Sequence, residues 1–207
     1  MDDSTLHWSL VAADSCPGDW VKTVQQALNT PLPKAPRYAA QLLWQRQLCT
    51  PEQLAGFLDP LAYEPTPTTD LGPDLTWAVE RILKAHRIGE KVAIWGDFDA
   101  DGVTATAVLW DGLGDLFEKH EQLTYYIPNR MTESHGLSRE GLDELHHWGA
   151  ALIVTCDTGS TDGPEIDYAR ALGMEVIVTD HHTLPDQRPD VVALINPRSL
   201  PPNHPLG

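Results

Sequence analysis

From about residue 75 onward the sequence alternates between short apolar runs and longer amphipathic stretches, and this alternation restricts the fold most. The apolar runs have the length of buried strands and lie at 91–96, 123–127, 151–156 and 175–179, with 191–195 as a candidate fifth. Stretches with helical spacing lie at 75–86, 103–117, 138–148 and 163–172. This order predicts an α/β fold, a doubly wound and mainly parallel sheet with helices on both faces.

The N-terminal third of the chain has a different pattern. Prolines separate short helical patterns at 20–28, 38–47 and 51–58. Thr50 is a candidate N-cap for the last of these, with Pro51 at its first helical position. Segment 63–72, in which Pro and Thr alternate, has the composition of a linker. We therefore expect a helical lead-in and linker over residues 1–74 and an α/β domain over 75–207.

The composition is that of a globular chain, because 207 residues with 42% hydrophobic content can bury a substantial core. No apolar run approaches the roughly 20 residues of a membrane helix, and the N-terminus is acidic where a secretory signal would be basic. The three cysteines fit neither a disulfide framework nor a zinc site, so we expect reduced thiols. We expect no membrane association and a cytoplasmic location.

The net charge of −16 argues against a nucleic-acid binder, since affinity for phosphates comes from Lys and Arg, of which there are 14. Two circumstances weaken this argument. Bound divalent cations would cancel part of the negative charge, and a basic surface can lie on a part of the protein outside this sequence.

Three carboxylates, Asp97, Asp99 and Asp101, follow the apolar run at 91–96. In an extended segment alternate side chains share a face, so these three would project together and repel one another without a cation between them. They follow the end of a predicted strand, which is where open α/β sheets place their sites. The segment therefore indicates a site for divalent metal.

Two further predicted strands end in polar residues of the same kind. Asp157 follows the run at 151–156, and Asp180, His181 and His182 follow the run at 175–179. An aspartate after a strand is by itself more often a turn or capping residue than a ligand. Three such strand ends on one edge of a parallel sheet would nevertheless supply the carboxylates and imidazoles that a pair of divalent ions requires.

These motifs resemble those of the DHH phosphoesterase superfamily, and within it most closely the RecJ family of bacterial single-strand-specific DNA exonucleases. The residues that carry the resemblance are Gly96-Asp-Phe-Asp-Ala-Asp-Gly-Val-Thr-Ala105, Asp157-Thr-Gly159 and Asp180-His-His182. Segments 43–60, 127–137 and 195–197 resemble the same family, so the likeness extends from about residue 40 to the end.

The resemblance implies a set of roles for the site residues. Asp99, Asp101, Asp157 and His181 would bind two divalent ions, Mn²⁺ or Mg²⁺, with Asp157 bridging them, and Asp97 would ligate or only support. His182 would contact the scissile phosphate, and Asp180 would orient the histidine pair. Arg130 is a candidate phosphate contact, with a salt bridge at the rim as the open alternative.

The function implied by the resemblance is metal-dependent hydrolysis of single-stranded DNA from 5′ to 3′ in repair and recombination. The family continues past the Asn-Pro segment into a further metal-binding aspartate and C-terminal domains, whereas this sequence stops at Gly207. We therefore expect the N-terminal catalytic core of a longer enzyme, or a family member that has lost its C-terminal clamp, with weak or no nuclease activity alone. Single-stranded DNA would bind largely through the missing regions, and repair proteins are candidate partners.

Two alternatives stay open. A DHH phosphodiesterase could act on short oligonucleotides or cyclic dinucleotides, although those smaller enzymes generally lack the helical lead-in. A non-catalytic DHH module could bind partners in a replication or repair assembly, although the metal motifs show no decay here.

Overall fold

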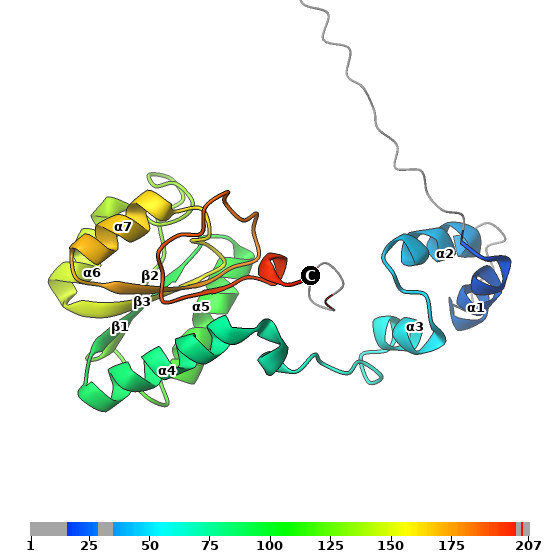
Figure 1. Ribbon diagram of the computed structural model, residues 1–207, viewed down its shortest axis with the longest axis horizontal. Helices are drawn as coiled ribbons and strands as arrows, with labels where there is room; N and C mark the ends of the chain where they lie inside the picture. Colours follow the sequence, from blue (N-terminus) through cyan, green and yellow to red (C-terminus); the bar gives the residue numbers. More distant parts are fainter. Residues whose placement is uncertain (1–15, 29–34, 202–203, 205–207) are drawn as a thin grey trace, which may run out of the picture. The chain divides into compact units, whose positions relative to one another are not determined.

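The computed structural model describes residues 16–28, 35–201 and 204. The chain divides into two compact units, Met1–Pro65 and Thr66–Gly207 (Figure 1). The division falls inside segment 63–72, which has the composition of a linker. Residues 66–74, including the short 3-10 helix η1 (Thr68–Leu71), belong to the second unit, whereas the sequence pattern groups them with the lead-in.

The first unit is helical in its described part. Its helices are α1 (Gly18–Leu28), α2 (Ala35–Gln45) and α3 (Pro51–Leu58). Helix α3 begins as predicted: the Thr50 side chain accepts the backbone N–H of Gln53, and the Gln53 side chain accepts the N–H of Thr50 in return. The end predicted for α2 is wrong, because Gln47 adopts a left-handed φ of 61° that cannot continue a helix.

A small separate core holds these three helices together. Its buried members come from all of them: Trp20, Val24, Ala40, Leu43 and Leu54. The Trp20 indole also donates to the carbonyl of Ala40 at 3.2 Å, which ties α1 to α2.

The second unit is built on a five-stranded sheet in the order β2-β1-β3-β4-β5, in which every neighbouring pair is parallel. The strands are β1 (Lys91–Gly96), β2 (Leu123–Tyr126), β3 (Ala150–Cys156), β4 (Glu175–Thr179) and β5 (Ala193–Ile195). The central strands β1 and β3 are buried along nearly their whole length, as expected for a sheet covered on both faces.

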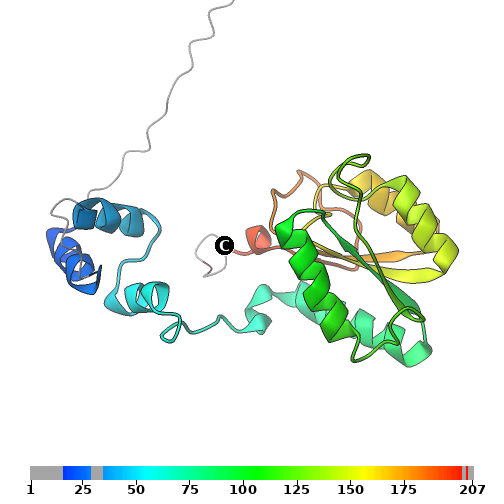
Figure 2. The same ribbon diagram turned by 180° about the vertical axis from the view of Figure 1, so that it is seen from behind.

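Helices cover both faces of this sheet (Figures 1 and 2). Helices α4 (Pro73–Ile88) and α5 (Ala100–Leu113) pack on one face, where Val92, Ile94 and Val154 belong to their hydrophobic cluster. Helices α6 (Arg139–Trp148) and α7 (Gly163–Ala171) pack on the other, around Trp95 and Ile153. The predicted doubly wound α/β fold is therefore confirmed.

The strand order decides where the polar strand ends meet. β1, β3 and β4 are consecutive in the sheet, so the residues that follow their carboxyl ends lie at one edge. These residues are Asp97, Asp157 and Asp180. None of the helices in the described part of the chain has the length and apolar character needed to cross a membrane.

Candidate metal centre

The segment after β1 turns at once into a helix. Asp97 is buried, and its Oδ1 accepts the backbone N–H of Phe98 at 2.6 Å. Asp99 is the N-cap of α5 and accepts the N–H groups of Asp101 and Gly102, each at 3.0 Å. The three carboxylates therefore do not share one face of an extended segment, and that expectation is wrong. The N-terminal N–H groups of a helix need acceptors, and Asp99 supplies one.

Gly102 allows the start of α5 to press against the end of β1. A Cβ atom at this position would lie 2.5 Å from the carbonyl oxygen of Asp97 and 2.6 Å from its Cβ. No side chain fits there without moving the backbone. The glycine of the motif thus has a packing reason, since it lets Asp97 and Asp99 lie next to the end of β3.

Asp157 follows β3 in a strained and buried position. Its φ of 63° lies in the left-handed region, and its side chain is only 6% exposed. Oδ1 lies 2.9 Å from Nε2 of His181, whereas Oδ2 is buried and has no hydrogen-bond partner in the described part of the chain. Burial raises the pKa of Asp157, and the negative charge of Asp99 raises it further.

Asp180 is the hydrogen-bonding centre of the segment after β4. Its Oδ1 accepts the backbone N–H groups of His181 at 2.7 Å and His182 at 3.1 Å, and it lies 2.8 Å from Nδ1 of His182. Its Oδ2 accepts the N–H of Ser160 at 3.0 Å. Burial alone would raise the pKa of Asp180, but the hydrogen bonds from Ser160 and His182 hold it below its ordinary value. The hydrogen bond to Asp180 raises the pKa of His182.

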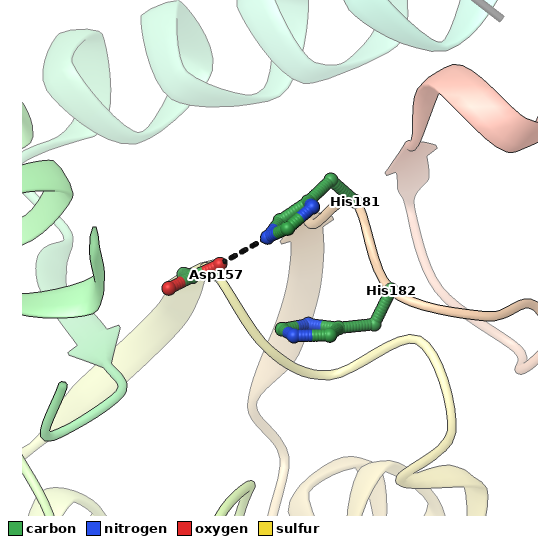
Figure 3. Close-up of side chains that lie close together, drawn as sticks. All are labelled: Asp157, His181 and His182. Carbon is green, nitrogen blue, oxygen red and sulfur yellow. Dashed lines mark ion pairs between the residues drawn. The ribbon is translucent and has the colours of Figure 1, made fainter. Parts of the chain in front are cut away.

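Asp157, His181 and His182 form a group that could hold a metal ion (Figure 3). One ligand atom from each lies within 4.8 Å of the others. A cavity of about 430 Å³ opens beside them. Its lining is Asp97, His135, Gly136, Asp157, Thr158, Gly159, Thr161, Asp162, Asp180, His182 and Thr183.

Asp101 lies apart from this cavity. It is exposed in the first turn of α5 and lines a second cavity of about 360 Å³, together with Cys156 and Thr179. Asp99 lies close enough to Asp157 for each carboxylate to act on the pKa of the other. Hydrogen bonds led by the N–H of Gly102 lower the pKa of Asp99. The structure thus brings Asp97, Asp99, Asp157 and the histidine pair to one edge of the sheet, and it places Asp101 in a second cavity beside the ends of β3 and β4.

The loop between β2 and α6 contributes His135, to which the sequence motifs assign no role. Its Nδ1 lies 2.9 Å from Oδ2 of Asp97, and its ring centroid lies 4.2 Å from that of Phe98. The Arg130 guanidinium lies 5.5 Å from the centroid of the same Phe98 ring, and no salt bridge to Arg130 occurs among the described residues. No periodicity marks a loop histidine. The only sequence signal for His135 is its place in the segment 127–137 that resembles the family.

Two carboxylates hold this loop in place. Glu133 accepts the hydroxyl of Tyr126 and the N–H of Asn129, both at 2.7 Å. Asp162, from the loop after β3, accepts the N–H of Leu137 at 2.8 Å. Gly136, with φ of 89°, passes so close to Asp162 that a Cβ atom would lie 2.5 Å from its Oδ2. The position of His135 next to Asp97 therefore depends on contacts of its loop with β2, with the loop after β3 and with the segment after β1.

The donor set fits a divalent transition metal. A buried carboxylate oxygen without a partner is costly unless a cation or a donor faces it, and Oδ2 of Asp157 is such an atom. The neighbouring negative charge of Asp99 adds to this cost. Mixed carboxylate and imidazole ligands suit Mn²⁺ and related ions. The geometry at this sheet edge could therefore hold a metal ion, with Asp157 among the candidate ligands.

Known proteins are similar to this chain in sequence. The chain is 35% identical over 199 residues to the single-stranded-DNA-specific exonuclease RecJ of Bacillus subtilis, covering 94% of this chain and 23% of that protein. It is 42% identical over 128 residues to the Escherichia coli enzyme of the same name, covering 62% and 22%. The chain thus spans less than a quarter of the length of these relatives.

Solved structures agree with the sequence relatives. The structure of RecJ in complex with Mn²⁺ from Thermus thermophilus matches with a TM-score of 0.60 and 28% identity, over 91% of this chain and 24% of that one. A structure of exonuclease RecJ bound to manganese matches with a TM-score of 0.55 and 33% identity, over 67% and 33%. The model of the DHH family, N-terminal domain, matches residues 91–203, which hold the whole sheet and all three strand-end motifs. The chain therefore belongs to the DHH family.

Proposed function

We propose that this chain is the metal-dependent catalytic core of a phosphodiester hydrolase, a RecJ-like exonuclease that degrades single-stranded DNA from 5′ to 3′ in repair and recombination. The observation that carries the proposal is the buried, unpartnered Oδ2 of Asp157 beside Asp99, His181 and His182. Relatives at 35% and 42% identity that bear the name of single-stranded-DNA-specific exonucleases support the substrate class.

In this proposal Asp97, Asp99, Asp101, Asp157 and His181 would hold two divalent ions, Mn²⁺ or Mg²⁺. Asp101 lines the second cavity together with Cys156 and Thr179, the residues that directly precede Asp157 and Asp180. When bound, the ions lower the pKa of a water and neutralise charge that develops on the phosphate. No covalent nucleophile is required.

The residues around the ions bind and orient the phosphate. Asp180 lies 2.8 Å from Nδ1 of His182 and thereby fixes the ring, leaving Nε2 for the cavity. The raised pKa of His182, caused by its hydrogen bond to Asp180, favours the cationic ring, which attracts phosphate oxygens. Arg130 is permanently charged, has no carboxylate partner in the described residues and is the second phosphate contact.

The acidity of the chain shapes the remainder of the proposal. A net charge of −16 repels a nucleic-acid strand, so the 207-residue chain alone binds DNA weakly and has little nuclease activity. Bound divalent ions cancel part of the charge, and the remaining affinity comes from basic surfaces in the rest of a longer protein. Repair proteins are further partners, and the location is cytoplasmic, where the three cysteines stay reduced.

The test is release of 5′-nucleotides from long single-stranded DNA by the natural protein that contains this chain, with Mn²⁺ and with a chelator. We expect Mn²⁺-dependent release that Asp157→Ala lowers at least a hundredfold, while Asp186→Asn, at an exposed aspartate, leaves it unchanged. Activity retained in Asp157→Ala would contradict the role given to that residue. Preference for oligonucleotides of a few residues would instead favour the short-substrate phosphodiesterase, and absence of a tight Mn²⁺ site would favour the non-catalytic module.

A further inference from the structure

Asn196 directly follows β5 and is 2% exposed. Its side-chain nitrogen donates to the Ser160 hydroxyl and to the backbone carbonyl of His182, both at 3.0 Å. Its side-chain oxygen accepts the N–H of Arg198 at 2.9 Å. Both amide protons and the amide oxygen are therefore used, and the three partners come from three different segments.

The direction of these hydrogen bonds can be followed from Asn196 to His182. The amide nitrogen of Asn196 can only donate, so the Ser160 hydroxyl accepts from it, while the backbone N–H of the same Ser160 donates to Oδ2 of Asp180 at 3.0 Å. Ionised Asp180 can only accept. Nδ1 of His182, 2.8 Å from Oδ1 of Asp180, must therefore carry a proton, which leaves Nε2 without a partner in the described part of the chain.

A second connection holds the backbone of the histidine pair. Asn196 binds the carbonyl of His182, and the Arg198 side chain donates to the carbonyl of His181 at 2.9 Å. The segment after β5 thus binds the backbone carbonyls of both histidines, whereas Asp180 binds their N–H groups. It contains no residue of the metal-ligand set proposed above.

We propose that Asn196 is a positioning residue of the metal centre: through Ser160 and Asp180 it sets the tautomer of His182, and through the His182 carbonyl it sets the place of the ring. This proposal rests on the proposed function and deepens it. An aspartate at this position would lose both donors and place a negative charge one hydroxyl away from Asp180. The proposal therefore requires the two N–H donors of the asparagine side chain. If Asn196 served only for packing, a neutral aspartic acid of the same shape would replace it without effect.

The test compares Asn196→Asp and Ser160→Ala with wild type and with the control Gln45→Glu, which makes the same amide-to-acid change at an exposed glutamine outside the α/β unit. In metal-free protein at alkaline pH, ¹⁵N shifts of the His182 ring report its tautomer, and calorimetry reports Mn²⁺ affinity. We expect the Nδ1–H tautomer in wild type and control, a mixture of tautomers in both network variants, and a 10- to 100-fold loss of Mn²⁺ affinity in Asn196→Asp. Ser160→Ala should lose less, since the bond from Asn196 to the His182 carbonyl remains.

Unchanged tautomer and unchanged Mn²⁺ affinity in Ser160→Ala and in folded Asn196→Asp would overturn the proposal. If Asn196→Asp fails to fold, the result for Ser160→Ala decides. A wild-type protein that binds no Mn²⁺ would overturn the proposed function instead, and the tautomer measured in metal-free protein would still decide the role of Asn196.

Discussion

Replacement of Asp157 by asparagine should stabilise the metal-free protein while it destroys the metal response. The side chain is 6% exposed, and its Oδ2 has no partner among the described residues. Burial and the charge of Asp99 raise its pKa. An acid whose pKa is raised on folding costs stability at pH values above that raised pKa, and the cost disappears as pH falls below the ordinary value of 3.8. The cost to the wild type is therefore larger at neutral pH than in acid.

The expected size follows from two opposing contributions. An unsatisfied buried oxygen costs about 1–3 kcal/mol, and asparagine replaces it with an amide that can donate toward Asp99. The ion pair with His181 is lost, but that histidine is 59% exposed, so the loss is about 0–1 kcal/mol. Asparagine also tolerates the left-handed φ of 63°. The net expectation is a gain of about 1–2 kcal/mol, or about 3–6 °C in Tm for a unit of this size.

Thermal unfolding at pH 7, followed by circular dichroism with a chelator and then with excess Mn²⁺, tests this reasoning. With the chelator, Asp157→Asn should melt above wild type. With Mn²⁺ at about 100 times its Kd, wild type should gain about 2.7 kcal/mol and the variant should not, so the order of stability inverts. Asp186→Asn serves as the control for removal of an exposed charge. A variant that melts below wild type in the chelator, or that responds equally to Mn²⁺, refutes the role assigned to the buried oxygen.

Three further changes test other parts of the site. Gly102→Ala places a Cβ atom 2.5 Å from the Asp97 carbonyl, so the free energy of unfolding in urea should fall by about 1–3 kcal/mol. The affinity for Mn²⁺ should fall as well. An unchanged urea midpoint would contradict the close packing. Glu133→Gln should cost about 1 kcal/mol at pH 7. Hydrogen bonds, first that from the Asn129 N–H, lower the pKa of Glu133 below its ordinary value of 4.5, so its stabilisation is present above pH 4.5, is lost as pH falls through the lowered pKa, and the two proteins should converge in acid. Asp101→Asn should lower Mn²⁺ affinity in calorimetry less than Asp97→Asn, because Asp101 lines the other cavity; an equal loss would show that its side chain turns into the centre.

Much of the sheet could be predicted because its strands are buried on both faces. The runs 91–96 and 175–179 coincide with β1 and β4, and β3 begins one residue earlier than its run. The start of α5 could not be predicted, since an aspartate after a strand can be a ligand, a cap or both. Asp99 caps α5 through the N–H groups of Asp101 and Gly102, so the helix begins at Ala100 and not at residue 103 as predicted.

The metal-site residues carried by strand ends could be predicted in part. Asp157 and the histidine pair end apolar strands, and the strand order puts them next to one another. His135 and Asn196 could not be assigned roles from the sequence, because one lies in a loop and the other follows a three-residue strand. Their roles arise from contacts with Asp97 and with Ser160, respectively, which no local pattern records.

The sequence by itself determined the fold class, the family and the three strand ends that meet at one edge. It could do so because apolar runs, helical spacing and their order along the chain can be read from local stretches of residues. Only the tertiary structure decided which acidic groups face the centre. A helix start after β1 put Asp101 in the first turn of α5 and kept Asp99 near Asp157. The left-handed backbone at Asp157 buried one carboxylate oxygen without a partner, and hydrogen bonds from distant segments oriented His182. Charge and orientation depend on neighbours brought together by folding, so the sequence predicts candidate ligands, whereas the fold determines their charge and orientation.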